Sequence, residues 1–150
     1  MGTGSGIQAV TAALKGEVDE VVAVDINPEA IEAAKGRARD AGVLDKITFK
    51  VSDLFSEVEG RFDWITFNPP YLRSEEGLTD PTWDGGDTGG ELIERFLQES
   101  GVHLTPRGSI FLVYSSETGL ETGGYGYSWE VLEELPLFFE RLYCVRLSPS

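Results

Sequence analysis

The segment Asn68-Pro69-Pro70-Tyr71 directly follows an apolar run, Phe62–Phe67, that is typical of a buried strand. Two consecutive prolines cannot continue a sheet ladder, so the chain must leave the strand in an extended, stiff conformation. The Asn68 amide and the Pro69 carbonyl then lie at the carboxyl end of the strand, where open α/β sheets bind ligands. Two fixed acceptors beside the Tyr71 ring are suited to holding a planar NH2 group. The alternative is an Asn-Pro turn without chemistry.

A glycine-rich loop, Gly2-Thr3-Gly4-Ser5-Gly6, leads into a helical pattern. Such loops place backbone N–H groups and the start of a helix next to a ligand. The Gly-x-Gly-x-Gly spacing is tighter than that of dinucleotide-binding proteins. It favours a loop beneath an amino-acid-like tail over one beneath a pyrophosphate. The alternative is a flexible chain end.

Two acids follow successive apolar strands. Asp25 comes about twenty residues after the glycine loop, where an acid can accept hydrogen bonds from both ribose hydroxyls. Asp53 follows the next strand and could accept from an adenine amino group, with Leu54 packing on the ring. Taken singly, Asp25 could be a solvated residue beside a helix and Asp53 a turn residue.

The net charge is −14, with 26 acidic and 12 basic residues. This balance disfavours a nucleic-acid partner, whose phosphates bind clustered basic residues. A high-salt cytoplasm, in which screening weakens the self-repulsion of an acidic surface, would explain this net charge. We therefore expect a halophilic source.

The single cysteine, Cys144, excludes an internal disulfide and fits a reducing cytoplasm. Together with the only histidine, His103, it makes no ligand cluster, so no metal site is expected. We expect neither a membrane span nor a leader.

Strand and helix patterns alternate along the chain, which predicts an α/β fold with a doubly wound, mostly parallel sheet in a single domain, 1–150. A turn is expected at Pro106-Arg107-Gly108, and a terminal antiparallel hairpin around Pro136. The expected helices are 7–14, 28–41 and 90–100, and the expected strands are 21–25, 47–51, 62–67, 110–115, 129–135 and 140–147. Asn27 should cap the second helix and Gly42 end it.

Two elements are missing from this order. A glycine loop of this type normally follows a strand, yet only Met1 precedes Gly2. The segment 117–127 holds four glycines and no helical period before the hairpin. We therefore expect the first strand, and residues around 117–127, to be absent from this sequence.

Taken in order, the glycine loop, Asp25, Asp53 and Asn68-Pro69-Pro70-Tyr71 resemble the motifs of class I S-adenosylmethionine-dependent methyltransferases. The last motif resembles that of enzymes methylating amide or exocyclic amine nitrogen. Within these, residues 80–90, DPTWDGGDTGG, look like the loop of the HemK group, which methylates the glutamine of the Gly-Gly-Gln motif in peptide-chain release factors. The short chain is similar to the archaeal and eukaryotic branch.

The resemblance implies S-adenosylmethionine as cofactor and a Rossmann-like sheet of seven strands in the order 3-2-1-4-5-7-6. The residues implied to bind the cofactor are Gly2, Thr3, Gly4, Gly6, Asp25, Ile26, Asp53, Leu54 and Asn68. The implied catalytic residues are Asn68, Pro69 and Tyr71, and the substrate would also contact Pro70 and Trp83.

Relatives of that branch work with a small zinc-binding activator protein. The expected strand order leaves Ile47–Val51 at an edge, with only Lys50 to discourage pairing with another chain. We therefore expect a heterodimer in which the activator adds a strand there.

Three other functions stay open at this point. The motif at Asn68 also serves N6-adenine or N2-guanine methyltransferases of nucleic acids. A nicotinamide-dependent dehydrogenase is disfavoured by the glycine spacing and by the lack of a proton-transfer residue. A binding module without activity is disfavoured by the intact Asn68 and Asp25.

Overall fold

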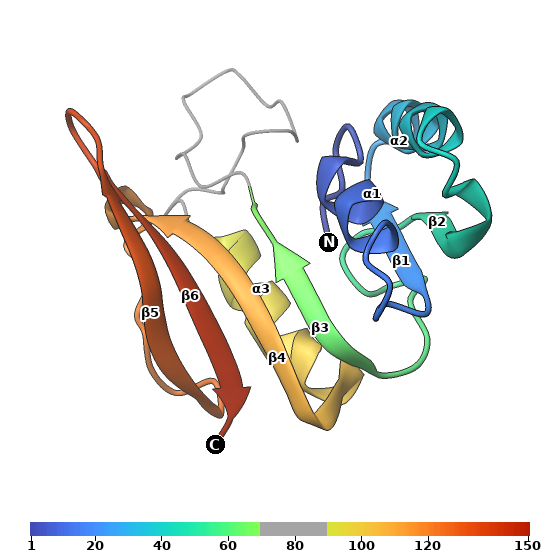
Figure 1. Ribbon diagram of the computed structural model, residues 1–150. Helices are drawn as coiled ribbons and strands as arrows, with labels where there is room; N and C mark the ends of the chain where they lie inside the picture. The colour runs from blue at the N-terminus through green and yellow to red at the C-terminus, as the bar shows by residue number, and fades with distance from the viewer. Residues whose placement is uncertain (70–89) are drawn as a thin grey trace. The chain divides into compact units, whose positions relative to one another are not determined.

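The computed structural model describes residues 1–69 and 90–150, which form two compact units, Met1–Val58 and Glu59–Ser150 (Figure 1). Each unit contains its own sheet. Among the described residues, no helix combines the length and the apolar character needed to cross a bilayer.

The first unit has two parallel strands joined by a helical crossover. Its elements are α1 (Ile7–Ala13), β1 (Val21–Asp25), α2 (Pro28–Asp40), η1 (Leu44–Lys46) and β2 (Ile47–Val51). The register runs from Val21 opposite Ile47 to Asp25 opposite Val51, so both strands end at the same edge. The core is built mostly of small side chains: Ala9, Val10, Ala13, Ala23, Ala38 and Ile47.

The ends of α2 follow the sequence prediction. The Asn27 side chain accepts a hydrogen bond of 2.9 Å from the Glu29 N–H, and Pro28 occupies the first helical position. Gly42 follows the helix with φ 72°, a left-handed conformation that glycine adopts without a steric penalty. The local signals therefore fix where α2 begins and ends.

The second unit is a four-stranded mixed sheet in the order β3-β4-β6-β5. Its elements are β3 (Phe62–Phe67), α3 (Glu91–Ser100), η2 (Gly101–His103), β4 (Leu104–Ser115), η3 (Ser116–Thr118), β5 (Tyr127–Pro136) and β6 (Arg141–Pro149). β3 and β4 are parallel, while β6 is antiparallel to both β4 and β5. The rings of Phe67 and Phe96 lie 4.5 Å apart, which packs α3 against one face of β3.

These strand orders confirm the expected fold class. β1 and β2 are adjacent and parallel, as expected of the second and third strands. The order β3-β4-β6-β5 matches the 4-5-7-6 half of the expected sheet, including the antiparallel terminal hairpin. Between Ser116 and Ser128 the structure has only the short η3 in place of an α-helix, as the sequence predicted.

The prediction of a turn at Pro106-Arg107-Gly108 is wrong. These residues lie inside β4, where the pairing with β3 shifts register between Phe62 and Trp64. Such a bulge accommodates a proline, which cannot donate to the ladder. A Cβ on Gly108 would lie 2.9 Å from the Phe62 carbonyl oxygen, so the bulge also requires glycine.

β3 is buried on one face only, whereas its apolar sequence is typical of a buried strand. Ile65 and Phe67 are buried, but Trp64 is 63% exposed. Trp64 makes an edge-to-face contact with Phe111 of β4, at 6.4 Å between ring centroids. The alternation within Phe62–Phe67 therefore reflects two different faces.

Candidate functional site

The glycine loop is tied to the end of β1. The Thr3 N–H donates to the Val24 carbonyl at 2.8 Å, and the Gly4 N–H donates to Asp25 Oδ2 at 2.9 Å. Gly2 and Gly4 have backbone φ angles of 59° and 51°, which residues other than glycine rarely adopt. The structure therefore brings the predicted loop and Asp25 together.

Gly6 has a separate reason to be glycine. It has φ 82°, and a Cβ there would lie 2.8 Å from the Ala34 Cβ. The start of α1 and the middle of α2 thus approach each other closely only because both residues are small. The Arg37 Nε donates to the Ser5 carbonyl at 2.9 Å and holds the loop against α2.

The Asp25 carboxylate accepts two backbone hydrogen bonds at the end of β1. Besides Gly4, it accepts from the Asn27 N–H through Oδ1 at 3.0 Å. A carboxylate offers about four acceptor positions, so these two bonds leave capacity for further donors. Two hydroxyl groups of a ligand could use that remaining capacity.

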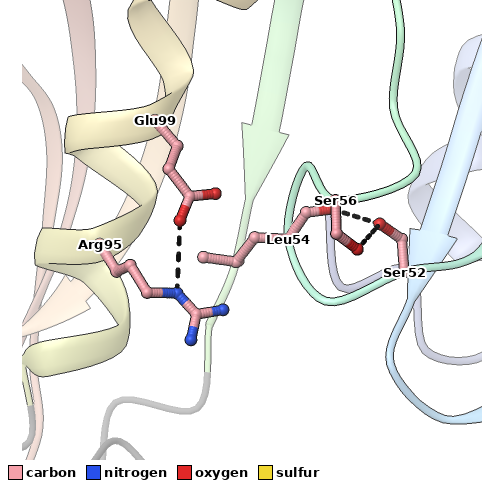
Figure 2. Close-up of polar contacts among 5 residues, drawn as sticks. All are labelled: Ser52, Leu54, Ser56, Arg95 and Glu99. Carbon is pink, nitrogen blue, oxygen red and sulfur yellow. Dashed lines mark hydrogen bonds and ion pairs between the residues drawn. The ribbon is translucent and has the colours of Figure 1, made fainter.

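The turn after β2 is organised by Ser52, a residue to which the sequence analysis gave no role (Figure 2). Ser52 is buried, and its Oγ donates to the Leu54 carbonyl at 2.7 Å. The same Oγ accepts from the Glu57 N–H at 3.1 Å. The Ser56 Oγ lies 3.3 Å from the Ser52 Oγ. Serine is common in turns, so the sequence carries no signal that distinguishes this one.

The same turn holds Leu54 in an unusual conformation. Leu54 has φ 47° and is the one non-glycine residue with positive φ among the described residues. Its side chain is buried at 6% exposure, while its neighbour Asp53 is exposed. The Ser52 N–H donates to the Asp25 carbonyl at 2.9 Å, so the ends of β1 and β2 are joined directly. The glycine loop, Asp25 and the Asp53-Leu54 turn therefore form one cluster at the carboxyl edge of the first unit's sheet.

In the second unit, Asn68 and Pro69 follow β3 directly. Asn68 is exposed and Pro69 is buried, and the preceding Phe67 is anchored against α3. The structure thus fixes the backbone that carries the Asn68 side chain. The other predicted residues of this motif and its loop, Pro70, Tyr71 and Trp83, lie outside the described residues.

Neither Cys144 nor His103 belongs to these clusters. Cys144 is half-buried in β6, where burial and the nearby Glu133 carboxylate raise the pKa of its thiol. The His103 Nδ1 lies 3.1 Å from the Gly60 carbonyl oxygen. In residues 1–69 and 90–150, no three His, Cys, Asp or Glu side chains gather as metal ligands would.

The model of one protein family, described as the methyltransferase small domain, matches residues 1–123. The chain belongs to that family. This methyltransferase is 38% identical over 155 residues to a putative protein N5-glutamine methyltransferase of Methanocaldococcus jannaschii, covering 97% of the chain and 77% of the relative. It is also 38% identical over 120 residues to a release factor glutamine methyltransferase of Koribacter versatilis. That match covers 72% of the chain and 42% of the bacterial relative.

Among solved structures, the methyltransferase resembles the Mtq2–Trm112 complex of E. cuniculi, responsible for methylation of the eRF1 translation termination factor. The TM-score is 0.65 at 21% identity, covering 98% of this chain and 96% of the other, and this likeness shows the fold alone. The family and the relatives together identify a class I methyltransferase of the HemK group, which confirms the resemblance stated from the motifs.

Class I methyltransferases use S-adenosylmethionine, and the first unit has features that fit this cofactor. The Thr3 hydroxyl is buried with no hydrogen-bond partner among the described residues, and a Cβ on Gly4 would meet only open space. Ile26 is 52% exposed beside Asp25, an apolar surface that a flat ring can cover. Donor, acceptor and apolar surfaces are all present at one sheet edge.

Proposed function

We propose that this methyltransferase methylates the side-chain nitrogen of the glutamine in the Gly-Gly-Gln motif of a peptide-chain release factor. The observation that carries the proposal is Asn68-Pro69 at the carboxyl end of β3, with Asn68 exposed and Pro69 buried. The names of the archaeal and bacterial relatives support the same reaction.

Asn68 and Pro69 orient the reacting nitrogen. An amide nitrogen is a poor nucleophile because its lone pair is delocalised into the carbonyl group. If the Asn68 Oδ1 and the Pro69 carbonyl each accept one N–H, the lone pair is directed at the methyl donor. When bound, S-adenosylmethionine would supply the electrophilic methyl group: the N–C bond would form as the C–S bond of the sulfonium breaks, a neutral thioether would leave, and the amide nitrogen would release one proton to solvent. Fixed in-line orientation, together with acceptors for the polarised N–H groups, would supply much of the rate enhancement.

We assign cofactor binding chiefly to the first unit. The glycine loop would hold the amino-acid tail, Asp25 the ribose hydroxyls, and Asp53 the adenine amino group. Ile26 and Leu54 would contact the adenine ring. The residues so assigned in that unit are Gly2, Thr3, Gly4, Gly6, Asp25, Ile26, Asp53 and Leu54. Asn68 would serve both cofactor and substrate.

Tyr71 would pack on the amide plane of the substrate, with Pro70 stiffening the turn. Trp83, which stands two residues before Gly85-Gly86 in the sequence, would contact the Gly-Gly-Gln peptide. Replacing Trp83 with alanine should then raise KM for the release factor and leave cofactor affinity unchanged.

We further propose that the two units work as one methyltransferase domain, because the family model extends from residue 1 to 123 and so across both. The enzyme would act in the cytoplasm, where translation terminates.

A small zinc-binding activator protein is proposed to pair with β2. Among the described residues, β2 is hydrogen-bonded to β1 alone, and Val51 is 47% exposed. The Lys50 Nζ donates to the Glu57 carbonyl at 2.8 Å, which holds this cation on its own chain. The Mtq2–Trm112 complex, in which a protein of this fold is bound to a second protein, supports a partner of this kind.

The deciding experiment is mass spectrometry of recombinant release factor after incubation with the enzyme and isotopically labelled S-adenosylmethionine. The expected result is one labelled methyl group on the glutamine of the Gly-Gly-Gln motif. A release factor with alanine at that glutamine is the matched control and should take no label. Label on tRNA or rRNA in place of the release factor would support the nucleic-acid alternative, which the net charge of −14 disfavours.

A further inference from the structure

The turn between β5 and β6 carries two adjacent aromatic side chains in solvent. Phe138 is 92% exposed and Phe139 is 87% exposed. Their rings are in edge-to-face contact, with 4.7 Å between the ring centroids. Leu137 beside them is 45% exposed. We call Leu137, Phe138 and Phe139 the aromatic tip. Single exposed apolar residues are ordinary, but a contiguous apolar cluster marks an interaction surface.

The aromatic tip is held in place by hydrogen bonds. The Leu137 N–H donates to the Glu140 carbonyl at 2.8 Å and closes the turn. The Glu140 carboxylate accepts from the Ser115 hydroxyl, and the Arg141 N–H donates to Ser116 Oγ at 3.0 Å. The tip is therefore anchored to the end of β4, and a partner that binds it meets a preorganised surface.

The tip lies at the sheet edge that carries Asn68. β6 is antiparallel to β4 with Ser115 opposite Leu142, and β5 is antiparallel to β6, so β5 runs in the direction of β3. The β5–β6 turn thus leaves the sheet at the carboxyl end of β3 (Figure 1). A macromolecule that approaches Asn68 from this edge also approaches the tip.

The distance between Asn68 and the aromatic tip determines how large a partner must be to contact both. The strand order places the hairpin about 10–14 Å across the sheet from β3, at about 4.8 Å per strand. Phe67 is level with Leu112 and Val145, and the four residues from Val145 to Arg141 add about 13 Å along β6. Asn68 and the tip are therefore roughly 15–20 Å apart by strand spacing and rise.

A Gly-Gly-Gln tripeptide extends only about 10 Å, so a peptide centred on Asn68 does not reach the tip. A folded domain does, because a standard interface of about 800 Å² per partner is roughly 30 Å across. Acidic side chains also border the tip. Residues 130–141 contain four glutamates and one arginine, and Glu134 and Glu130 form ion pairs with Arg141 and Arg146. Among the described residues, this leaves Glu133 and Glu140 as the acids near the tip without an ion pair. The complementary surface is an apolar patch bordered by lysine or arginine.

We infer that the aromatic tip is a docking site for the folded domain that carries the Gly-Gly-Gln loop, separate from the groups that hold the glutamine. This inference rests on the proposed function. The two phenylalanines are the anchors of the contact, and large apolar anchors of this kind carry most of the binding energy of an interface. The site recognises the body of the protein substrate, while Asn68 recognises its amide.

The test compares a folded release-factor domain with a short Gly-Gly-Gln peptide as substrates of the enzyme, together with its activator if activity requires one. The double variant F138S/F139S should lower kcat/KM for the domain by about tenfold or more, the loss expected of two interface anchors. It should leave kcat/KM for the peptide within about twofold. The matched control, Val102→Ser, removes a side chain that is 69% exposed in η2, ahead of β4, and should change neither value.

Each other result overturns the inference. Equal loss on both substrates would place the tip in the active site or the fold, and unchanged values on both would remove the docking role. If the double variant only converts a homodimer into a monomer on gel filtration, the tip binds a second copy. If the wild-type enzyme methylates neither substrate, the proposed function itself fails. Melting curves check folding, and the single variants Phe138→Ser and Phe139→Ser replace the double one if it unfolds.

Discussion

The carboxylate of Asp25 accepts a hydrogen bond from the backbone N–H of Gly4, 21 residues earlier, at 2.9 Å. This contact joins the two strongest sequence signals of the first unit, a glycine loop and an acid at the end of a strand. Asp25 therefore shapes the loop, in addition to the ribose binding proposed for it.

Replacing Asp25 with alanine should weaken S-adenosylmethionine binding by about 1–3 kcal/mol, because ribose hydroxyls and the Gly4 N–H lose their acceptor. Calorimetry measures the change. Asp45→Ala, which removes an exposed acid from η1, is the control and should bind as the wild type does. Unchanged affinity in the Asp25 variant would remove Asp25 from the cofactor site.

Asn68→Ala should lower kcat by about 10²-fold or more, by analogy with the loss of one aligned polar group at a reacting centre. Cofactor affinity should change far less, since most of the assigned cofactor contacts lie in the first unit. Single-turnover kinetics separates the two effects. A fall of less than about threefold would show that Asn68 does not hold the substrate amide.

Ser52→Ala should destabilise the protein by about 1–3 kcal/mol, because the buried Leu54 carbonyl loses its donor and the part-buried Glu57 N–H its acceptor. The loosened turn should also weaken cofactor binding. Urea unfolding and calorimetry give the two values. Ser56→Ala removes an exposed hydroxyl from the same turn and should have a small effect on both.

Gly6→Ala should destabilise the protein, since the new methyl group would lie 2.8 Å from the Ala34 Cβ and the residue would keep φ 82°. Gly36→Ala is the matched control in α2, where a Cβ meets nothing within 4 Å. Alanine is favoured over glycine in a helix by about 0.8–1 kcal/mol, so the control should raise the free energy of unfolding. The two changes should therefore have opposite signs in thermal unfolding, and equal signs would contradict the close packing at Gly6.

The proposed activator interface is best tested at Val51. Ile47 belongs to the core of the first unit, so an acid there would disturb folding as well as binding. Val51 is 47% exposed at the end of β2, and Val51→Asp should reduce co-elution with the activator on gel filtration. Melting curves check that the variant is folded at the temperature of the experiment, because the new carboxylate would lie opposite Asp25 in the strand register. Thr48→Val, at an exposed position of the same strand, should preserve the complex. Undiminished binding by Val51→Asp would place the interface elsewhere.

The sequence predicted elements best where one local signal decides them. Asn27, Pro28 and Gly42 bound α2 through capping, a fixed φ and a left-handed conformation, all of which are properties of single residues. The bulge in β4 was missed because Pro106 and Gly108 are equally typical of a turn, and only the pairing with β3 decides between them.

In the candidate site, too, the sequence predicted what single residues decide and missed what tertiary contacts decide. The positions of Gly4 and Asp25 at one sheet edge follow from strand alternation, whereas the role of Ser52 depends on three backbone and side-chain contacts that its residue type does not reveal. The aromatic tip was also missed. Phe138 and Phe139 read as part of an apolar hairpin, and only the structure shows that both side chains are left in solvent.

The left-handed backbone of Leu54 has a kinetic consequence. This conformation costs a leucine about 1–2 kcal/mol, while full burial of its side chain contributes about 1.5–3 kcal/mol. Packing within the protein thus maintains the turn, and no ligand is needed to impose it. Cofactor association at this turn should therefore be a single second-order step whose rate rises linearly with concentration, without the plateau that a slow loop rearrangement would produce.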